Sequence, residues 1–76
     1  MEDWKIRVQY LDRYDVILDL SKSKALKKFR ELKESMFEKQ IVWCELIFDS
    51  IENENEVIVD SFENKVVSLF GYNIVF

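Results

Sequence analysis

The chain has 76 residues, of which 49% are hydrophobic and 14% aromatic, and it carries a net charge of −4. A chain of this length forms a single domain, residues 1–76, and its apolar content excludes an intrinsically disordered protein. Histidine is absent and Gly71 is the only glycine. These absences exclude Ser–His and Cys–His nucleophile pairs, Cys-and-His metal clusters and glycine-rich phosphate loops. We therefore expect a protein that is not an enzyme and that uses no cofactor and no metal ion.

The cellular location is predicted from the cysteine content and the start of the chain. Cys44 is the single cysteine and cannot form an internal disulfide, which favours a reducing compartment. The start, Met1 to Asp3, is acidic where a secretory signal would be basic. No apolar run approaches the roughly 18–20 residues of a membrane span. We expect a cytoplasmic protein that does not contact membranes.

The first third of the sequence predicts a β-hairpin. Residues 4–10 alternate between apolar and polar side chains, which is the period of a strand with one wet face. Residues 12–15 break this run and are expected to form the turn. Residues 16–20 then return as the second strand.

A helix is predicted next, over residues 23–38. Ser21 or Ser23 can cap its N-terminus, because a serine hydroxyl accepts a hydrogen bond from a free amide of the first turn. A stripe at steps of three and four residues predicts the face that packs on a sheet. Its members are Leu26, Phe29, Leu32, Lys33, Met36 and Phe37.

The second half of the sequence predicts further strands. Residues 41–48 are apolar at both parities, which is typical of a central strand or of a strand at an interface. An acidic loop at 49–56 follows, then a strand at 57–62, a turn at 63–65 and a strand at 66–70. Gly71 marks a bulge or bend before an apolar tail.

The predicted fold class is α+β, a mostly antiparallel sheet of 4–6 strands with one amphipathic helix packed on one face. The element order is β-β-α-β-β-β. One helix covers one sheet face, so the other face is expected to carry Ile17, one apolar row of residues 41–48 and part of the tail. Contiguous exposed apolar patches usually mark a contact surface. This predicts a homodimer or a tight partner, with a tail folded over that face as the alternative.

Charge is segregated along the chain. Residues 21–40 hold seven basic and three acidic side chains, whereas residues 41–76 hold one basic and seven acidic side chains. The basic residues crowd the start of the predicted helix, where the helix dipole disfavours cations. Three interpretations stay open: an anion or nucleic-acid site, long-range balance with the acidic half, and a solvated face. The residues of the anion-site interpretation are Lys22, Lys24, Lys27 and Lys28.

Six carboxylates lie within 15 positions of the acidic half. They are Asp49, Glu52, Glu54, Glu56, Asp60 and Glu63. A calcium loop of the EF-hand type would need a glycine where Glu54 stands, so this pattern does not favour a metal site. The run is either a solvated hairpin tip or a row of negative charge that docks on a basic groove of a partner. In the second case Trp43 and Ile47, on the neighbouring strand, are the expected apolar anchors.

Short length, negative charge, the acidic hairpin at 49–56 and the missing catalytic groups give the chain a class-level resemblance. It resembles small acidic inhibitor proteins of phages and mobile elements, including anti-CRISPR proteins. This resemblance implies inhibition of a larger partner, such as a nucleic-acid-handling or host-defence protein, in the host cytoplasm. The positively charged helix departs from a pure DNA mimic. The alternatives are a nucleotide- or nucleic-acid-binding module that uses the helix start, and a structural homo-oligomer subunit.

Overall fold

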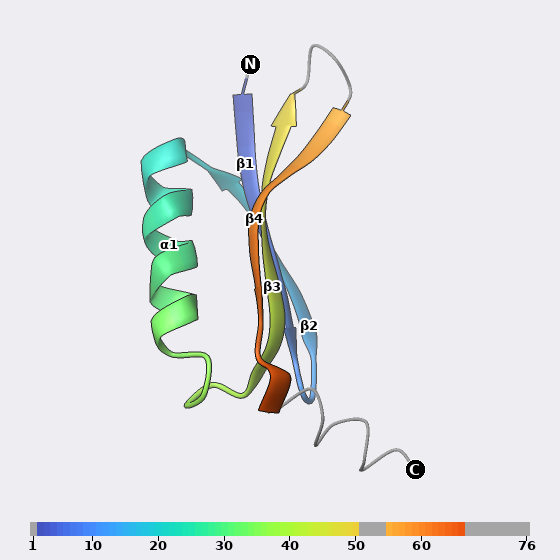
Figure 1. The fold of residues 1–76 in the computed structure, drawn as a ribbon. Coiled ribbons are helices and arrows are strands. Elements are labelled where there is room, and N and C mark those ends of the chain that lie inside the picture. The colour runs from blue at the N-terminus through green and yellow to red at the C-terminus, as the bar shows by residue number, and fades with distance from the viewer. Residues whose placement is uncertain (1, 51–54, 67–76) are drawn as a thin grey trace.

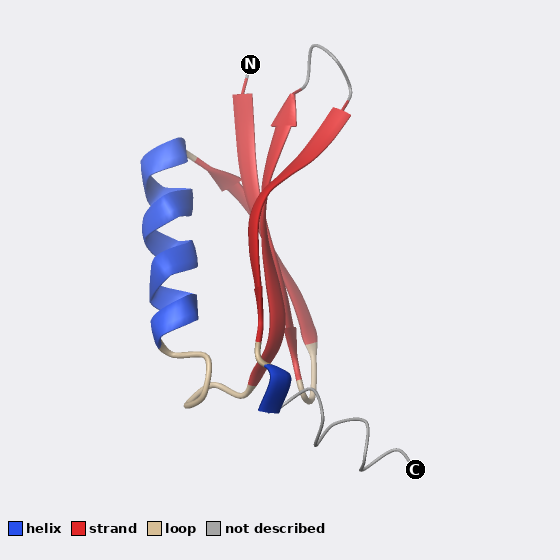
Figure 2. Cartoon of the chain, in the orientation of Figure 1, coloured by secondary structure: helices blue, strands red, loops and turns tan. Residues whose placement is uncertain are grey.

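The computed structural model describes residues 2–50 and 55–66. They form one antiparallel sheet of four strands, in the order β2-β1-β3-β4, with one helix against one face (Figures 1 and 2). The predicted α+β class is confirmed. The elements are β1 (Glu2–Tyr10), β2 (Tyr14–Leu20), α1 (Lys22–Glu34), β3 (Ile41–Ser50) and β4 (Asn55–Glu63).

The β1–β2 hairpin closes through a tighter turn than predicted, because β2 already begins at Tyr14. The amide of Tyr10 donates to the carbonyl of Arg13 at 2.8 Å. The side chain of Gln9 donates to the same Arg13 carbonyl at 3.1 Å and to the Tyr10 carbonyl at 2.7 Å. These bonds satisfy backbone acceptors at the turn and hold β2 in register beside β1.

The helix begins as predicted but ends earlier. Ser21 is the N-cap, and its hydroxyl accepts a hydrogen bond from the amide of Lys24 at 3.4 Å. The expected end at residue 38 is wrong. The carbonyl of Glu31 accepts hydrogen bonds from both the amide and the hydroxyl of Ser35, at 3.1 and 2.8 Å, and the next amide, that of Met36, donates to Lys33 in a tighter turn. Phe37 consequently lies in the turn and is 60% exposed, so its expected place in the core is also wrong.

The buried stripe of α1 differs from the predicted one by one position. Ala25, Phe29 and Leu32 are buried at steps of four and three, whereas Leu26 is exposed. Met36 is half-buried beyond the end of the helix and packs against the same core. The sequence pattern found Phe29 and Leu32 correctly, but the small Ala25 carried too weak a hydrophobic signal to be included.

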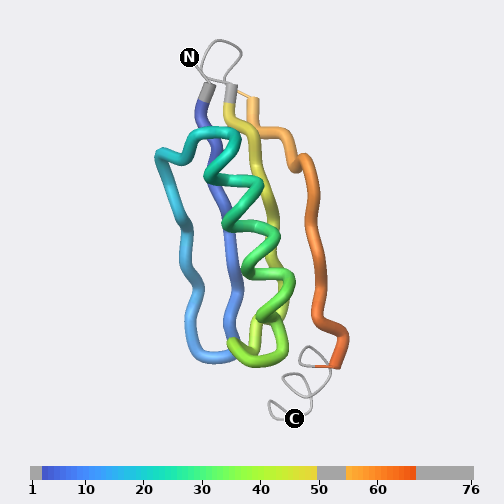
Figure 3. Tube along the Cα trace, turned by 90° about the vertical axis from the view of Figure 1, so that its left-hand side faces the viewer, coloured from blue at the N-terminus to red at the C-terminus, as the bar shows by residue number. Residues whose placement is uncertain are grey.

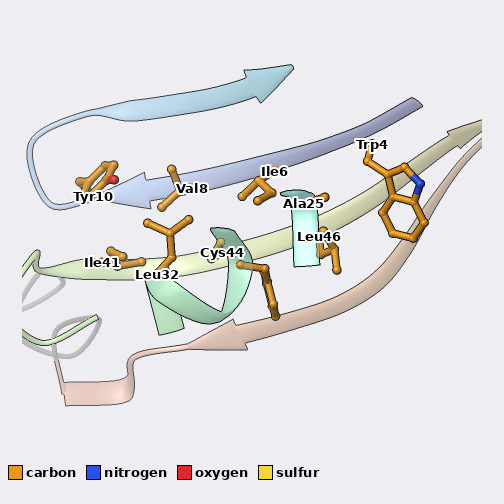
Figure 4. Packing of buried hydrophobic residues seen from close by; sticks show 10 residues of the cluster. Trp4, Ile6, Val8, Tyr10, Ala25, Leu32, Ile41, Cys44 and Leu46 are labelled. Carbon is orange, nitrogen blue, oxygen red and sulfur yellow. The ribbon is translucent and has the colours of Figure 1, made fainter. Parts of the chain in front are cut away.

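The core lies between α1 and the two central strands. Figure 4 shows its side chains converging from β1, β3 and α1. The strands contribute Trp4, Ile6, Val8, Tyr10, Ile41, Cys44 and Leu46. Burial of such side chains is the main source of stability in a chain this short, at about 1.5–3 kcal/mol for a fully buried aliphatic residue.

Ile17 was expected on the sheet face opposite the helix, but the strand register places it in this core. Ile17 pairs with Ile6, so both side chains lie on the same side of the sheet, and Ile17 packs against the helix-side cluster. A β-bulge follows in β2, where Asp19 has a φ of 58°. The extra residue lets Leu20 return to the helix side opposite Trp4.

The last described segment departs from the predicted strand order. β4 is longer than expected and includes Asn55 and Glu56, which the sequence analysis placed in the loop. Lys65 and Val66 are helical, so the strand predicted at 66–70 is wrong at its first residue. Residues 67–70, Gly71 and the tail lie outside the described residues, as do Glu52 and Glu54.

Candidate functional site

The sheet face turned away from α1, called here the open face, is covered by no other element of the described chain (Figure 1). Strand alternation and register place its side chains. β1 contributes Asp3, Lys5, Arg7 and Gln9, β2 contributes Tyr14, Val16 and Leu18, β3 contributes Trp43, Glu45, Ile47 and Asp49, and β4 contributes Glu56, Ile58, Ser61 and Glu63.

Ion pairs cross three strands at one end of the open face. Lys5 of β1 forms a hydrogen-bonded ion pair with Glu56 of β4 and lies 3.8 Å from the carboxylate of Asp49. Arg7 Nη2 bonds to Glu56 Oε2 at 2.6 Å, and Arg7 Nη1 lies 3.8 Å from Glu45 Oε1. These five residues are called the charged cluster. With two cations and three carboxylates it is nearly balanced.

The charged cluster also explains the position of Ile47. β3 lies between β1 and β4, so the side chains that join Lys5 and Arg7 to Glu56 must pass over β3. Ile47 pairs with Lys5 on one side and Ile58 on the other, and it is fully buried. Ile47 was predicted to anchor a partner, but its side chain is covered by the charged cluster and packs against it.

Glu56 is the acidic residue most affected by this arrangement. Its hydrogen bond from Lys5 lowers the pKa of the carboxyl below its ordinary value, and the charge of Arg7 lowers it further, although partial desolvation opposes both. The carboxylate is therefore ionised and already partnered at neutral pH. A docking partner would have to compete with Lys5 and Arg7 for it.

An aromatic pair occupies the other end of the open face. Gln9 of β1 pairs with Tyr14 on one side and Trp43 on the other. The two rings lean over Gln9, whose side chain is bonded to the turn, and their centroids lie 6.0 Å apart at an angle of 52°. Such tilted contacts are favourable for aromatic rings. Trp43, predicted as an anchor, thus lies on the open face and is half-buried.

Exposed aliphatic side chains lie on the two edge strands of the open face. Leu18 of β2 is 60% exposed and Ile58 of β4 is 54% exposed, while Val16 lies between Leu18 and the aromatic pair. Together with Tyr14 they leave apolar surface on both sides of the charged cluster. Aromatic side chains are enriched in protein interfaces relative to the rest of the surface.

The acidic residues predicted for docking do not share one surface. Asp49 and Glu56 belong to the charged cluster, and Glu63 lies opposite Trp43 at the far end of β4. A bulge in β4 turns Asp60 to the helix side, where it pairs with Leu46. Glu52 and Glu54 lie outside the described residues. The single row of negative charge expected from the alternation is therefore not formed by the described members.

The basic residues predicted for anion binding are placed along the start of α1. Lys22, Lys24 and Lys27 are exposed and Lys28 is half-buried, and none of the four forms an ion pair with the described part of the chain. The Ser21 hydroxyl already accepts a hydrogen bond from the amide of Lys24. Anion binding at this helix start stays a prediction.

Cys44 lies in the core and is fully buried, as expected for an inert thiol. Burial raises the pKa of the Cys44 thiol to about 12, and the neighbouring charge of Glu45 adds to this effect. The thiol is protonated at neutral pH and is shielded from reagents.

The described residues hold no group of three or more histidine, cysteine, aspartate or glutamate side chains placed to bind a metal ion. The one helix among them has too few apolar residues in sequence to reach across a membrane. Comparison with protein-family models, curated proteins and solved structures found no match.

Sequence reasoning missed two features of the open face. Lys5 and Arg7 were assigned to a wet strand face, but their link to Glu56 depends on which strands are neighbours. Tyr14 was placed in the turn, so its contact with Trp43 was not foreseen. The alternation of residues 4–10 was the one signal that could have indicated paired charges on this face.

Proposed function

We propose that this protein is a non-enzymatic binding protein that docks on a larger protein through its open face and inhibits that partner by occupying its surface. The supporting observation is the combination of Tyr14 and Trp43 with exposed Leu18 and Ile58 around a charged cluster. Small monomeric proteins rarely leave such apolar surface exposed without a contact role. Large aromatic side chains carry much of the binding energy in known interfaces.

The class of partner is proposed from the resemblance to small acidic phage inhibitors. A nucleic-acid-handling protein, such as a host-defence effector, offers basic surfaces that attract an acidic protein with a net charge of −4. Because Glu56 is held by Lys5 and Arg7, the negative charge on the described open face that forms no ion pair comes from Asp3 and Glu63. In this proposal, docking uses the apolar and aromatic surface for affinity and the net charge for steering.

A matched pair of variants tests the proposed surface. Leu18 and Phe37 are both 60% exposed, but Leu18 lies on the open face and Phe37 lies in the turn after α1. The tagged wild type, Leu18→Asp and Phe37→Asp are used to capture partners from host cells, and the captured protein is then titrated with each variant. We expect Leu18→Asp to lose binding and inhibition and Phe37→Asp to keep both. Equal binding by the two variants would contradict the proposal.

A second copy of the chain is the competing occupant of the open face. Sedimentation of the wild type over a hundredfold range of concentration distinguishes the two cases. A constant monomer mass supports a different partner. A concentration-dependent dimer that Leu18→Asp dissociates would assign the open face to self-association instead.

A further inference from the structure

A groove separates α1 from the edge strand β4, on the face of the sheet opposite to the open face. The helix lies across β1 and β3 and slants toward β4 at its C-terminal end (Figure 3). The groove has a volume of about 330 Å³. Its apolar lining consists of Leu26, Phe29, Leu46 and Val59, and its charged lining consists of Arg30, Lys33 and Asp60. Contact between the rings of Phe29 and Phe62, 5.4 Å apart, ties β4 to the helix.

The bulge in β4 shapes this groove. Ile47 pairs with Ile58 and Leu46 pairs with Asp60, so Val59 is the additional residue. A bulge of this kind lets two successive side chains lie on one side of a strand, and Val59 and Asp60 both line the groove. The irregularity therefore supplies an apolar wall and a carboxylate together.

The outer edge of β4 pairs with no other strand in the described residues. Its centre is three consecutive β-branched residues, Val57, Ile58 and Val59, all of which are about half exposed. An edge strand with free backbone donors and acceptors can accept another strand, and β-branched side chains stabilise such pairing. The groove then lies beside the position that an added strand would take.

The charges that line the groove indicate which kind of strand could pair with the edge of β4. Arg30 and Lys33 form no ion pair with the described part of the chain, and the groove contains one carboxylate, Asp60, against these two cations. An added strand with a carboxylate on its helix side would balance them. A second copy of β4 fits less well, because it would bring its own three carboxylates, Glu56, Asp60 and Glu63, beside the same three of the first copy. A segment with a single carboxylate on its helix side avoids most of that repulsion and still reaches the two cations.

We propose that β4 accepts an extended acidic segment of a partner protein as an additional strand. Apolar side chains of that segment occupy the groove between Leu26 and Val59, and one of its carboxylates pairs with Arg30 and Lys33. The groove lies on the opposite side of the sheet from the open face, and the two sites share only the edge residue Ile58. It also gives a role to two basic residues of α1 that lie beyond the helix start.

Labelled nine-residue peptides test the proposal. They alternate threonine and valine, and one valine is replaced by glutamate at each valine position in turn. We expect saturable binding of at least one of them, measured by fluorescence anisotropy, and new hydrogen-exchange protection of amides in β4. A peptide of the same sequence with methylated alternate amides cannot complete the strand pairing and is expected not to bind. Equal binding of the methylated peptide, or no binding of any peptide, would overturn the proposal.

Two variants of α1 distinguish the effect of a cation that lines the groove from the effect of the helix's overall positive charge. Arg30→Glu and Lys27→Glu make the same change on the same helix, but Lys27 does not line the groove. We expect Arg30→Glu to weaken peptide binding by about tenfold or more and Lys27→Glu to change it by less than about twofold, as expected for a direct charged hydrogen bond and a screened charge. Equal losses would overturn the assignment. A dimer at low concentration whose contact protects β4 amides would assign the edge to a second copy instead.

Discussion

The two faces of this sheet use the same strands for different purposes. The helix face buries Ile6, Val8 and Leu32 in a continuous apolar core, whereas the open face holds most of its charges in ion pairs and leaves Leu18 and Ile58 exposed. Stability therefore depends mainly on the strand residues that face the helix. The strand residues on the open face can serve binding, because few of their side chains are needed for folding.

β3 is the strand in which the two faces meet. Cys44 on the helix side and Ile47 on the open side are both fully buried, although different groups cover them. The helix covers the first, and the ion pairs among Lys5, Arg7 and Glu56 pass over the second. Burial on the open face therefore depends on charged side chains, which makes it sensitive to pH and salt.

Thiol labelling is expected to show the largest difference between the faces. In a Val16→Cys variant that keeps Cys44, the new thiol lies on the open face and Cys44 lies in the core. The small thiolate fraction of Cys44 should by itself slow its alkylation at least about a thousandfold relative to an ordinary cysteine, because its pKa is about 12 and that of an ordinary cysteine is about 8.5. Mass spectrometry after timed alkylation checks this ratio. Two thiols labelled at similar rates would contradict the described burial.

The second largest difference between the two faces is expected in the loss of stability when a leucine side chain is truncated. Leu32→Ala removes a fully buried side chain and should lower the free energy of unfolding by about 2–5 kcal/mol, whereas Leu18→Ala should change it by about 0.5 kcal/mol or less. Denaturation in urea measures both. If Leu32→Ala does not fold, Ile6→Val, with an expected loss of about 0.5–1.5 kcal/mol, provides the same test.

Aromatic coupling should be similar on the two faces. Double-mutant cycles with leucine replacements apply to Tyr14 and Trp43 on the open face and to Phe29 and Phe62 beside the groove. Each pair has centroids within 6.0 Å, and we expect coupling of about 0.5–1.5 kcal/mol in each. No measurable coupling between Tyr14 and Trp43 would indicate that the rings do not meet in solution.

The smallest expected effect concerns Glu56 and pH. A lowered pKa in the folded state means that Glu56 contributes stability above its unfolded pKa of about 4.3, and that this contribution is lost as the pH falls through the folded value. Glu56→Gln should therefore be less stable than the wild type at pH 7 and equally stable at low pH. Added salt should reduce the difference.

Glu63→Gln serves as the control for this titration, because Glu63 lies on the same strand and forms no ion pair with the described residues. Thermal unfolding between pH 2 and pH 7 measures both variants. A loss that is the same at every pH would show that Glu56 acts through packing and not through its charge.

The fold was largely predictable because period-2 and period-3.6 patterns are local. Alternation in residues 4–10 and the apolar run in 41–48 placed β1 and β3, and a serine cap at Ser21 or Ser23 marked the start of α1. The end of α1 was not predictable from the period, because the apolar spacing continues to Met36 and Phe37 although the backbone tightens after Ser35, whose hydroxyl adds a second hydrogen bond to the carbonyl of Glu31. A side-chain bond of this kind often bends a helix but leaves no periodic signal.

The candidate site was predicted less well, because it depends on neighbours far apart in the sequence. Trp43 was identified as an anchor from its place in an apolar strand, and the structure places it on the open face. The pairing of Lys5 with Glu56 joins residues 51 positions apart. It needs the strand order β1-β3-β4, which composition does not determine. The bulge that moves Asp60 to the groove is likewise a property of register, not of residue type.

The position of β1 at the centre of the sheet bears on how the chain folds. β1 with β2, and β3 with β4, are sequence-local hairpins, whereas the seam between β1 and β3 joins residues on opposite sides of α1. Local hairpins close quickly, and pairing across a long loop is slower because more chain entropy is lost. We expect the two hairpins to form first and their docking along this seam to limit the folding rate, with α1 shortening the distance that the seam must close.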